Sequence, residues 1–224
     1  MPQATPTRSP RQQKTLGRLL RATRDLAAAG GYAAVTMNAM AERAGVTRMT
    51  AYQYFRNRDH ALAELIVVWG AELAEKLALQ PPAVDPEADP VGAVQARFRW
   101  VIAELYREPQ LLSAVISATA NADPGVLAVT EGLDDVLADF VGDALGHVPE
   151  DQRPTLIRLL GYLFQSVLGA LATGKIALGQ AQEDMVQGMG LMTAGYRVLV
   201  REPAKARQAR EDAPAGEPST SRPC

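Results

Sequence analysis

Apolar residues along the chain recur mostly at intervals of three and four, the spacing that places side chains on one face of an α-helix. Alternation of apolar and polar residues, which would indicate strands, is scarce. The first segment, Gln12 to Ala29, ends at a pair of glycines and carries one apolar stripe: Leu16, Leu19, Leu20 and Leu26. The pattern therefore predicts an all-α protein.

Nine helices are expected, separated by residues that interrupt helices, chiefly Pro and Gly. Their expected ranges are 12–29, 37–44, 47–54, 59–79, 91–107, 110–120, 124–145, 154–173 and 181–200. The proline-rich stretch from Pro81 to Pro90 cannot continue a helix and marks a joint at the level of domains. We assign residues 11–62 and 63–202 to two domains. Residues 1–10 and 203–224 have little to bury, so both are expected to be disordered.

The net charge of −2 hides a difference between the two parts of the chain. Residues 1–62 carry 10 Lys or Arg against 3 Asp or Glu, whereas residues 63–224 carry 13 against 22. A basic module on an acidic body is typical of a DNA-binding domain attached to a domain that does not bind DNA, because phosphate neutralisation supplies most non-specific affinity. A chance distribution of surface charge would give the same asymmetry.

Residues 36–62 have the spacing of a helix-turn-helix. Gly45 permits the positive φ of a tight turn between two short helices. Val46, Ala51 and Phe55 form an apolar seam that would hold the second helix against the rest of the domain. The opposite face is then free for DNA, at the part of a helix-turn-helix that enters the major groove. It carries Arg48, Met49, Thr50, Tyr52, Gln53 and Tyr54.

This stretch resembles the N-terminal signature of the TetR family of transcriptional regulators, and the likeness covers about residues 12–62. The matching residues are Thr36, Met40, Ala41, Ala44, Gly45, Val46, Tyr52, Phe55 and Leu62, with Arg58 where the family usually has lysine. Two positions depart from the pattern. Met49 stands where a small residue is common, and Ala51 replaces a larger apolar residue, so base preference and packing under the helix are expected to differ from those of relatives.

The resemblance implies a three-helix DNA-binding domain followed by a helical domain for ligand binding and dimerisation. It implies that Thr36, Tyr52 and Arg58 contact phosphates. Base reading would fall to Arg48, which can pair with guanine, and to Gln53, which can pair with adenine. Met49 or Thr50 would touch thymine methyl groups. Thr47 and Tyr54 complete the expected set of DNA contacts. Alternatively, Tyr52 and Tyr54 merely fill a helix interface and Arg48 is a solvated charge.

The resemblance also implies a homodimer, because family members bind palindromic sites and join through their last two long helices, here 155–173 and 181–200. Packing within one chain would give the same periodicity, so the partner face stays open. The family encloses a small-molecule cavity between its fourth and eighth helices. Candidates for lining it are Trp69, Phe98, Trp100, Tyr106, Phe140, Phe164 and Gln165, all of which would also suit an ordinary core. Few charges interrupt these stripes, which favours a largely apolar effector.

Little in the chain supports catalysis or metal binding. The histidines are His60 and His147, and Cys224 is the sole cysteine, so no catalytic residue, cofactor, metal or disulfide is expected. The sequence GALATGK at 169–175 has the spacing of a phosphate-binding loop, but Ile176 replaces the required Ser or Thr and the context is helical. No signal peptide or long apolar span is recognised, which favours a cytoplasmic protein without membrane partners.

The sequence therefore predicts a ligand-responsive transcriptional regulator, a repressor that binds a palindromic operator in double-stranded DNA as a homodimer and is released by a small effector. The alternative is a helical module that binds small molecules or proteins and whose N-terminal motif does not read DNA. An operator footprint would distinguish the two.

Overall fold

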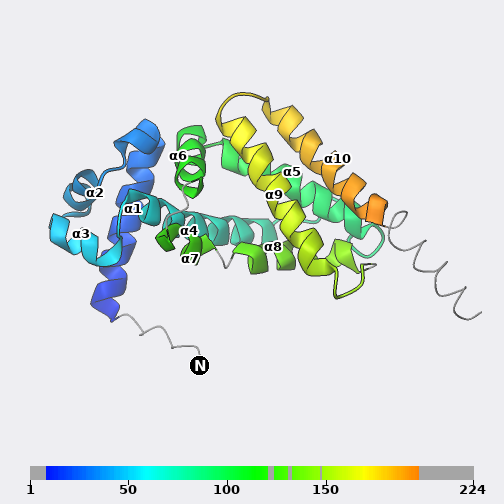
Figure 1. The fold of residues 1–224 in the computed structure, drawn as a ribbon, viewed down its shortest axis with the longest axis horizontal. Helices are drawn as coiled ribbons and strands as arrows, with labels where there is room; N and C mark the ends of the chain where they lie inside the picture. The colour runs from blue at the N-terminus through cyan, green and yellow to red at the C-terminus, as the bar shows by residue number, and fades with distance from the viewer. Residues whose placement is uncertain (1–8, 121–123, 131–132, 147, 197–224) are drawn as a thin grey trace, which may run out of the picture.

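The computed structural model describes residues 9–120, 124–130, 133–146 and 148–196. These residues form ten α-helices and one short 3₁₀ turn, with no strand among them, which confirms the all-α fold (Figure 1). The helices are α1 (Pro10–Ala34), α2 (Met37–Ala44), α3 (Arg48–Tyr54), α4 (Arg58–Ala78), α5 (Pro90–Tyr106), α6 (Pro109–Thr119), α7 (Pro124–Thr130), α8 (Leu133–Val141), α9 (Arg153–Ala172) and α10 (Leu178–Tyr196), and the 3₁₀ turn is η1 (Gly142–Leu145).

The single helix expected over 124–145 is wrong, and this accounts for a described helix count of ten rather than nine. Two helices and the 3₁₀ turn occupy that range. α7 packs against α4, whereas α8 packs against α9, so the two segments follow different neighbours. Gly142, a poor helix former, stands at the start of the 3₁₀ turn and weakens a continuous helix there.

The first helix begins two residues earlier than expected. The Ser9 hydroxyl accepts a hydrogen bond from the Gln12 N–H, and the Gln12 side chain accepts one from the Ser9 N–H, which forms a capping box. The predicted break at the glycines is confirmed, because Gly30 and Gly31 leave helical geometry and Gly31 has a φ of 62°. Most of the expected disordered ends, 1–8 and 203–224, lie outside the described residues, as do 197–200 of the last expected helix.

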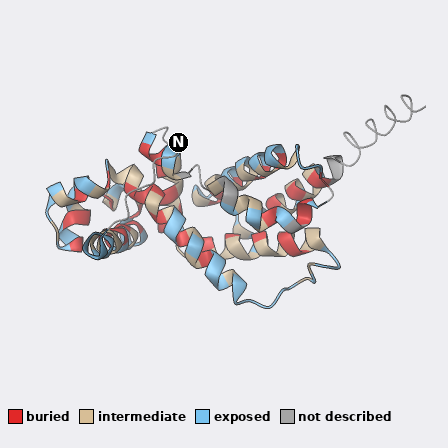
Figure 2. Ribbon diagram, turned by 90° about the horizontal axis from the view of Figure 1, so that it is seen from below, coloured by how far each residue is buried: buried red, intermediate tan, exposed pale blue. Residues whose placement is uncertain are grey.

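The helices α1 to α3 form one end of the molecule, and α4 leads from them to the body made by α5 to α10 (Figure 1). Figure 2 shows that buried positions lie on the facing sides of the helices at both ends of the molecule. One apolar cluster runs through both parts, including Leu19 and Phe55 at one end and Phe98 and Met185 in the body. The extensive packing of α1 on α6 therefore joins the helix-turn-helix directly to the body.

Ion pairs reinforce this junction at Arg24 of α1. Its guanidinium contacts Glu72 of α4 and Glu108, directly before α6, each at 2.6 Å, and lies 5.9 Å from the ring centre of Trp69. The hydrogen bond with Glu108 is the main cause that raises the pKa of Arg24, so its charge is permanent. One side chain of α1 is thus paired both with α4 and with the start of α6 in the body.

Candidate nucleic-acid interface

The turn between α2 and α3 depends on Gly45, which adopts the left-handed conformation with φ of 60°. The Val46 N–H donates to the Ala41 carbonyl at 2.9 Å and closes the turn. From α1, Arg18 donates to the carbonyls of Ala44 and Gly45, satisfying the end of α2. The predicted positive φ at this glycine is therefore confirmed, and α1 fixes the direction in which α2 ends.

The predicted apolar seam of α3 is also confirmed. Ala51 and Phe55 are fully buried, and Val46 is partly buried and packs against the core. The Thr47 hydroxyl accepts a hydrogen bond from the Thr50 N–H at 3.1 Å and caps the helix, as its position predicts. With these residues holding its inner side, α3 presents the opposite side to solvent.

That outer side carries most of the expected base-reading residues. Met49 is 71% exposed, and Arg48 and Gln53 are exposed as well. Arg48 donates from Nη2 to the Tyr52 hydroxyl at 3.3 Å and lies 5.4 Å from that ring centre, so its guanidinium lies beside Tyr52 on the surface of α3. Tyr54 is partly buried and packs against the core.

The hydroxyls expected at the interface have capping roles. Thr36 accepts a hydrogen bond from the Ala39 N–H at 3.1 Å and caps α2, and its own proton stays available to donate to a phosphate oxygen. The Thr47 and Thr50 hydroxyls lie 2.9 Å apart, so Thr50 is engaged at the start of α3. Anions are favoured beside such helix starts because the free N–H groups point towards them.

A hollow of about 320 Å³ lies where the starts of α2 and α4 meet α3. It brings together four residues expected at the interface: Thr36, Arg48, Tyr52 and Arg58. The other five expected contacts are on α3 or at its start but do not line this hollow: Thr47, Met49, Thr50, Gln53 and Tyr54.

Asn38 and Asn57 also line the hollow and were not expected from the sequence. The Asn57 side chain accepts a hydrogen bond from the His60 N–H at 2.8 Å and caps α4. An Asn immediately before an apolar helical run is a recognised start signal, which could have identified this residue.

Tyr32, near the end of α1, holds Arg58 beside the hollow and was likewise missed. Its ring centre lies 3.9 Å from the Arg58 guanidinium carbon, and its hydroxyl donates to Asp59 at 2.7 Å. Arg58 Nε also lies 3.8 Å from the Asp59 carboxylate. Burial, followed by the hydrogen bond to Asp59, raises the pKa of Tyr32, so the phenol keeps its proton.

Of the residues expected around an effector, three meet in the body. Phe98 is buried, and its ring centre lies 4.9 Å from that of Phe140 and 5.4 Å from that of Phe164. These rings come from α5, α8 and α9, so an aromatic cluster joins three helices.

The other four expected effector residues are dispersed. Trp69 is buried beside Arg24, and Trp100 is partly buried against the core. Tyr106 is 39% exposed and Gln165 is exposed. Their part in an effector cavity stays a prediction.

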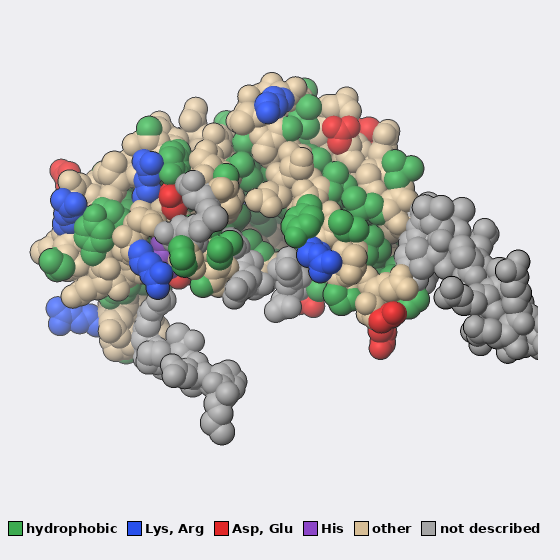
Figure 3. All heavy atoms as spheres, in the orientation of Figure 1, with side chains coloured by type: hydrophobic (Ala, Val, Ile, Leu, Met, Phe, Trp, Pro, Cys, Tyr) green, Lys and Arg blue, Asp and Glu red, His purple; other side chains and the backbone are tan. Residues whose placement is uncertain are grey.

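The last two described helices leave large apolar side chains uncovered. Tyr162 of α9 is 60% exposed, Leu159 is 44% exposed, and Leu191 of α10 is 74% exposed. Among the described helices, α9 alone is long and apolar enough to cross a membrane, and 28% of that span is buried within the chain. Figure 3 shows apolar side chains gathered over α9, whereas most of the visible Lys and Arg lie at the α1–α3 end. Length and composition alone are weak evidence for a membrane helix, and an apolar exposed surface is also what a protein interface presents.

Two family profiles match the chain. One, described as bacterial regulatory proteins of the tetR family, matches residues 19–65, and the other, a tetracyclin repressor-like C-terminal domain, matches 88–192. The HTH-type transcriptional repressor KstR of Mycolicibacterium smegmatis is 32% identical over 149 residues, which cover 63% of this chain and 69% of that repressor. The chain belongs to the TetR family.

Other relatives agree with this assignment. The HTH-type transcriptional repressor KstR of Rhodococcus jostii is 28% identical over 163 residues, covering 72% of this chain and 74% of that protein. A TetR regulator from Rhodococcus sp. RHA1 superposes with a TM-score of 0.71 at 25% identity over 81% of this chain and 97% of its own. The Thermus thermophilus TetR-family repressor FadR, solved with lauroyl-CoA, shares the fold at a TM-score of 0.60 and 23% identity, over 79% of this chain and 92% of its own. This TetR-family chain is a helix-turn-helix transcriptional regulator, in a family of DNA-binding regulators rather than enzymes.

Proposed function

We propose that this TetR-family chain represses transcription by binding a palindromic operator as a homodimer, and that a small, largely apolar effector releases it. The observation that carries the proposal is the hollow that gathers Thr36, Arg48, Tyr52 and Arg58 next to the exposed side of α3. Two guanidinium groups, two hydroxyls and the start of α2 converge there. This donor set suits phosphate oxygens, beside a helix that is free to enter a groove.

The contacts divide into two kinds. Thr36, Tyr52 and Arg58 bind phosphates and set the position of α3 on the duplex. Arg48 and Gln53 read base edges once Arg48 leaves Tyr52, and the exposed Met49 packs against thymine methyl groups. The excess of Lys and Arg in residues 1–62 also supports DNA binding at this surface, because DNA phosphates attract positive charge at long range.

The exposed apolar residues of α9 and α10 support dimerisation through those helices. A second copy related by a two-fold axis would cover Leu159, Tyr162 and Leu191 in a four-helix bundle. The helix-turn-helix units of the two copies would then have the same two-fold symmetry as a palindromic operator.

The aromatic cluster around Phe98 supports an effector site in the body, because the surrounding stripes carry few charges. An effector that binds one arrangement of the body more tightly shifts the population towards it. The ion pairs of Arg24 with Glu72 and Glu108 would transmit that shift to α1, and so to the helix-turn-helix.

An unbiased selection from random duplexes tests the proposal most directly. We expect a two-fold symmetric consensus, and binding that weakens linearly in log salt with a slope of about −0.9 per phosphate contact. Failure to prefer any duplex sequence, with no effector added, would overturn the proposal and favour a module that does not read DNA. Binding that ignores salt would contradict the phosphate contacts.

A further inference from the structure

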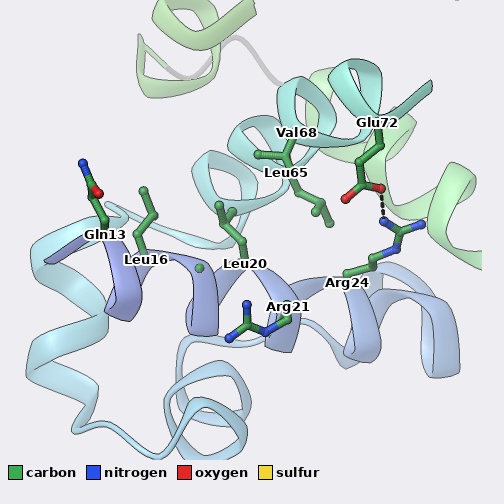
Figure 4. Close-up of a pocket in the computed structure, with 9 residues that line it drawn as sticks. Gln13, Leu16, Leu20, Arg21, Arg24, Leu65, Val68 and Glu72 are labelled. Carbon is green, nitrogen blue, oxygen red and sulfur yellow. Dashed lines mark hydrogen bonds and ion pairs between the residues drawn. The ribbon is translucent and has the colours of Figure 1, made fainter. Parts of the chain in front are cut away.

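An open groove lies between α1 and α4, apart from both the DNA-facing hollow and the aromatic cluster of the body (Figure 4). Its volume is about 600 Å³, within the range of small-molecule sites. Leu16 and Leu20 of α1 and Leu65 and Val68 of α4 supply its apolar walls. Val68 is 39% exposed, so apolar surface remains uncovered here.

Gly17 lies in the groove, inside a helix where glycine is less favourable than alanine. No tight packing requires it. A Cβ at this position would meet only Arg21 Nη1, at 3.6 Å, which is ordinary contact with the end of a flexible side chain. The missing side chain leaves the groove open rather than admitting a neighbouring helix.

The charges of the groove are unequally satisfied. At one end, Arg24 is paired with Glu72, as the dashed line in Figure 4 shows. At the rim, Arg21 is exposed, and no carboxylate of the described residues pairs with it. An apolar groove with one unpaired guanidinium at its rim is complementary to a molecule that has an apolar chain and a single anionic group.

We infer that the α1–α4 groove binds an aliphatic carboxylate, with its chain along Leu16, Leu20 and Val68 and its carboxylate at Arg21. The site lies between a helix of the DNA-binding end and the helix that leads to the body. A ligand in the groove contacts both helices next to the Arg24–Glu72 pair. Occupancy therefore alters DNA affinity, a step that rests on the proposed function.

Calorimetric titration of the full chain with dodecanoate tests the site without any DNA. We expect saturable binding that falls at least about tenfold for Arg21→Gln, because a charge-assisted contact is lost. Dodecanol, which lacks the charge, is expected to bind more weakly by a similar factor. Lys14→Gln is the matched control, since Lys14 is exposed on α1 outside the groove lining.

Gly17→Leu fills the groove and is expected to abolish the same binding while the protein stays folded, as thermal melting would verify. Gly70→Leu is its control, because a Cβ at Gly70 meets nothing within 4 Å and this residue does not line the groove. Wild-type binding by a folded Gly17→Leu variant would overturn the inference and place any dodecanoate elsewhere, for example near Phe98.

Absence of dodecanoate binding to the wild-type protein would also overturn the inference. In that case, protection of the Leu16 and Leu20 amides from hydrogen exchange that increases with protein concentration would assign the groove to a second copy of the chain. Operator binding is measured separately, so a failure to select any duplex affects the proposed function alone. The calorimetric titration with dodecanoate alone decides whether the carboxylate site exists.

Discussion

The Arg58 guanidinium lies against the face of the Tyr32 ring, 3.9 Å from its centre. The phenol is itself held by the hydrogen bond to Asp59, so the end of α1 fixes a cation at the start of α4. A cation–π contact contributes about 0.5 to 2 kcal/mol, depending on exposure. Tyr32 therefore orients Arg58, which we propose binds a phosphate, without needing to touch DNA itself.

Tyr32→Leu is expected to lower affinity for specific and random duplexes alike by up to about thirtyfold, because Arg58 loses the ring that orients it. Tyr32→Phe keeps the ring and should lose much less. Fluorescence anisotropy with both kinds of duplex measures this. In an Arg58→Ala background, Tyr32→Leu should cause no further loss. A full additional loss there would show that Tyr32 acts by another route.

Arg48→Ala and Tyr52→Phe are expected to separate base reading from phosphate binding. The first should relax preference at one base pair by about 1 to 3 kcal/mol, and the second should weaken all duplexes similarly. Competition binding against operators substituted one base pair at a time measures both. If Arg48→Ala also lost affinity equally for specific and random DNA, as Tyr52→Phe is expected to do, the assigned roles would be contradicted.

Gly45→Ala is expected to destabilise the fold by about 1 to 2 kcal/mol, because an L-residue is strained in the left-handed conformation. The added Cβ would also lie 2.8 Å from Arg18 Nη2, which must then move away. Chemical denaturation measures the free energy of unfolding. Gly70→Ala, in the interior of α4 with nothing within 4 Å of its Cβ, should instead stabilise by up to about 1 kcal/mol. Two equal effects would contradict the strain at Gly45.

Leu191→Glu is expected to weaken the proposed dimer at least about tenfold, because the new charge would be buried in the α9–α10 interface. Its free energy of unfolding as a monomer should change little, since the side chain is 74% exposed in one chain. Sedimentation equilibrium measures the association. Leu79→Glu, at an 85% exposed position after α4, serves as control. Equal association by both variants would move the interface elsewhere.

The helix-turn-helix could be predicted because its determinants are local. Thr36, Gly45 and Thr47 act within four residues along the chain as caps and turn, and Ala51 and Phe55 follow helical spacing. Such short-range signals can be recognised without knowing the tertiary fold.

Long-range contacts could not be predicted in the same way. Tyr32 meets Asp59 across 27 positions, and Arg24 meets Glu108 across 84, so nothing in the local pattern pairs them. The division of 124–145 depends on which neighbour each segment packs against, α4 for one and α9 for the other. Helical periodicity reports that a face is buried, not what buries it.

The double engagement of Arg24 makes the junction sensitive to ionic strength. Its two ion pairs are partly exposed, with 26% of the Arg24 side chain accessible, so dissolved ions screen them. Added salt thus weakens the connection between the two ends of the molecule. In this regulator the firmness of the junction between α1, α4 and α6 therefore depends on the ionic strength of its surroundings.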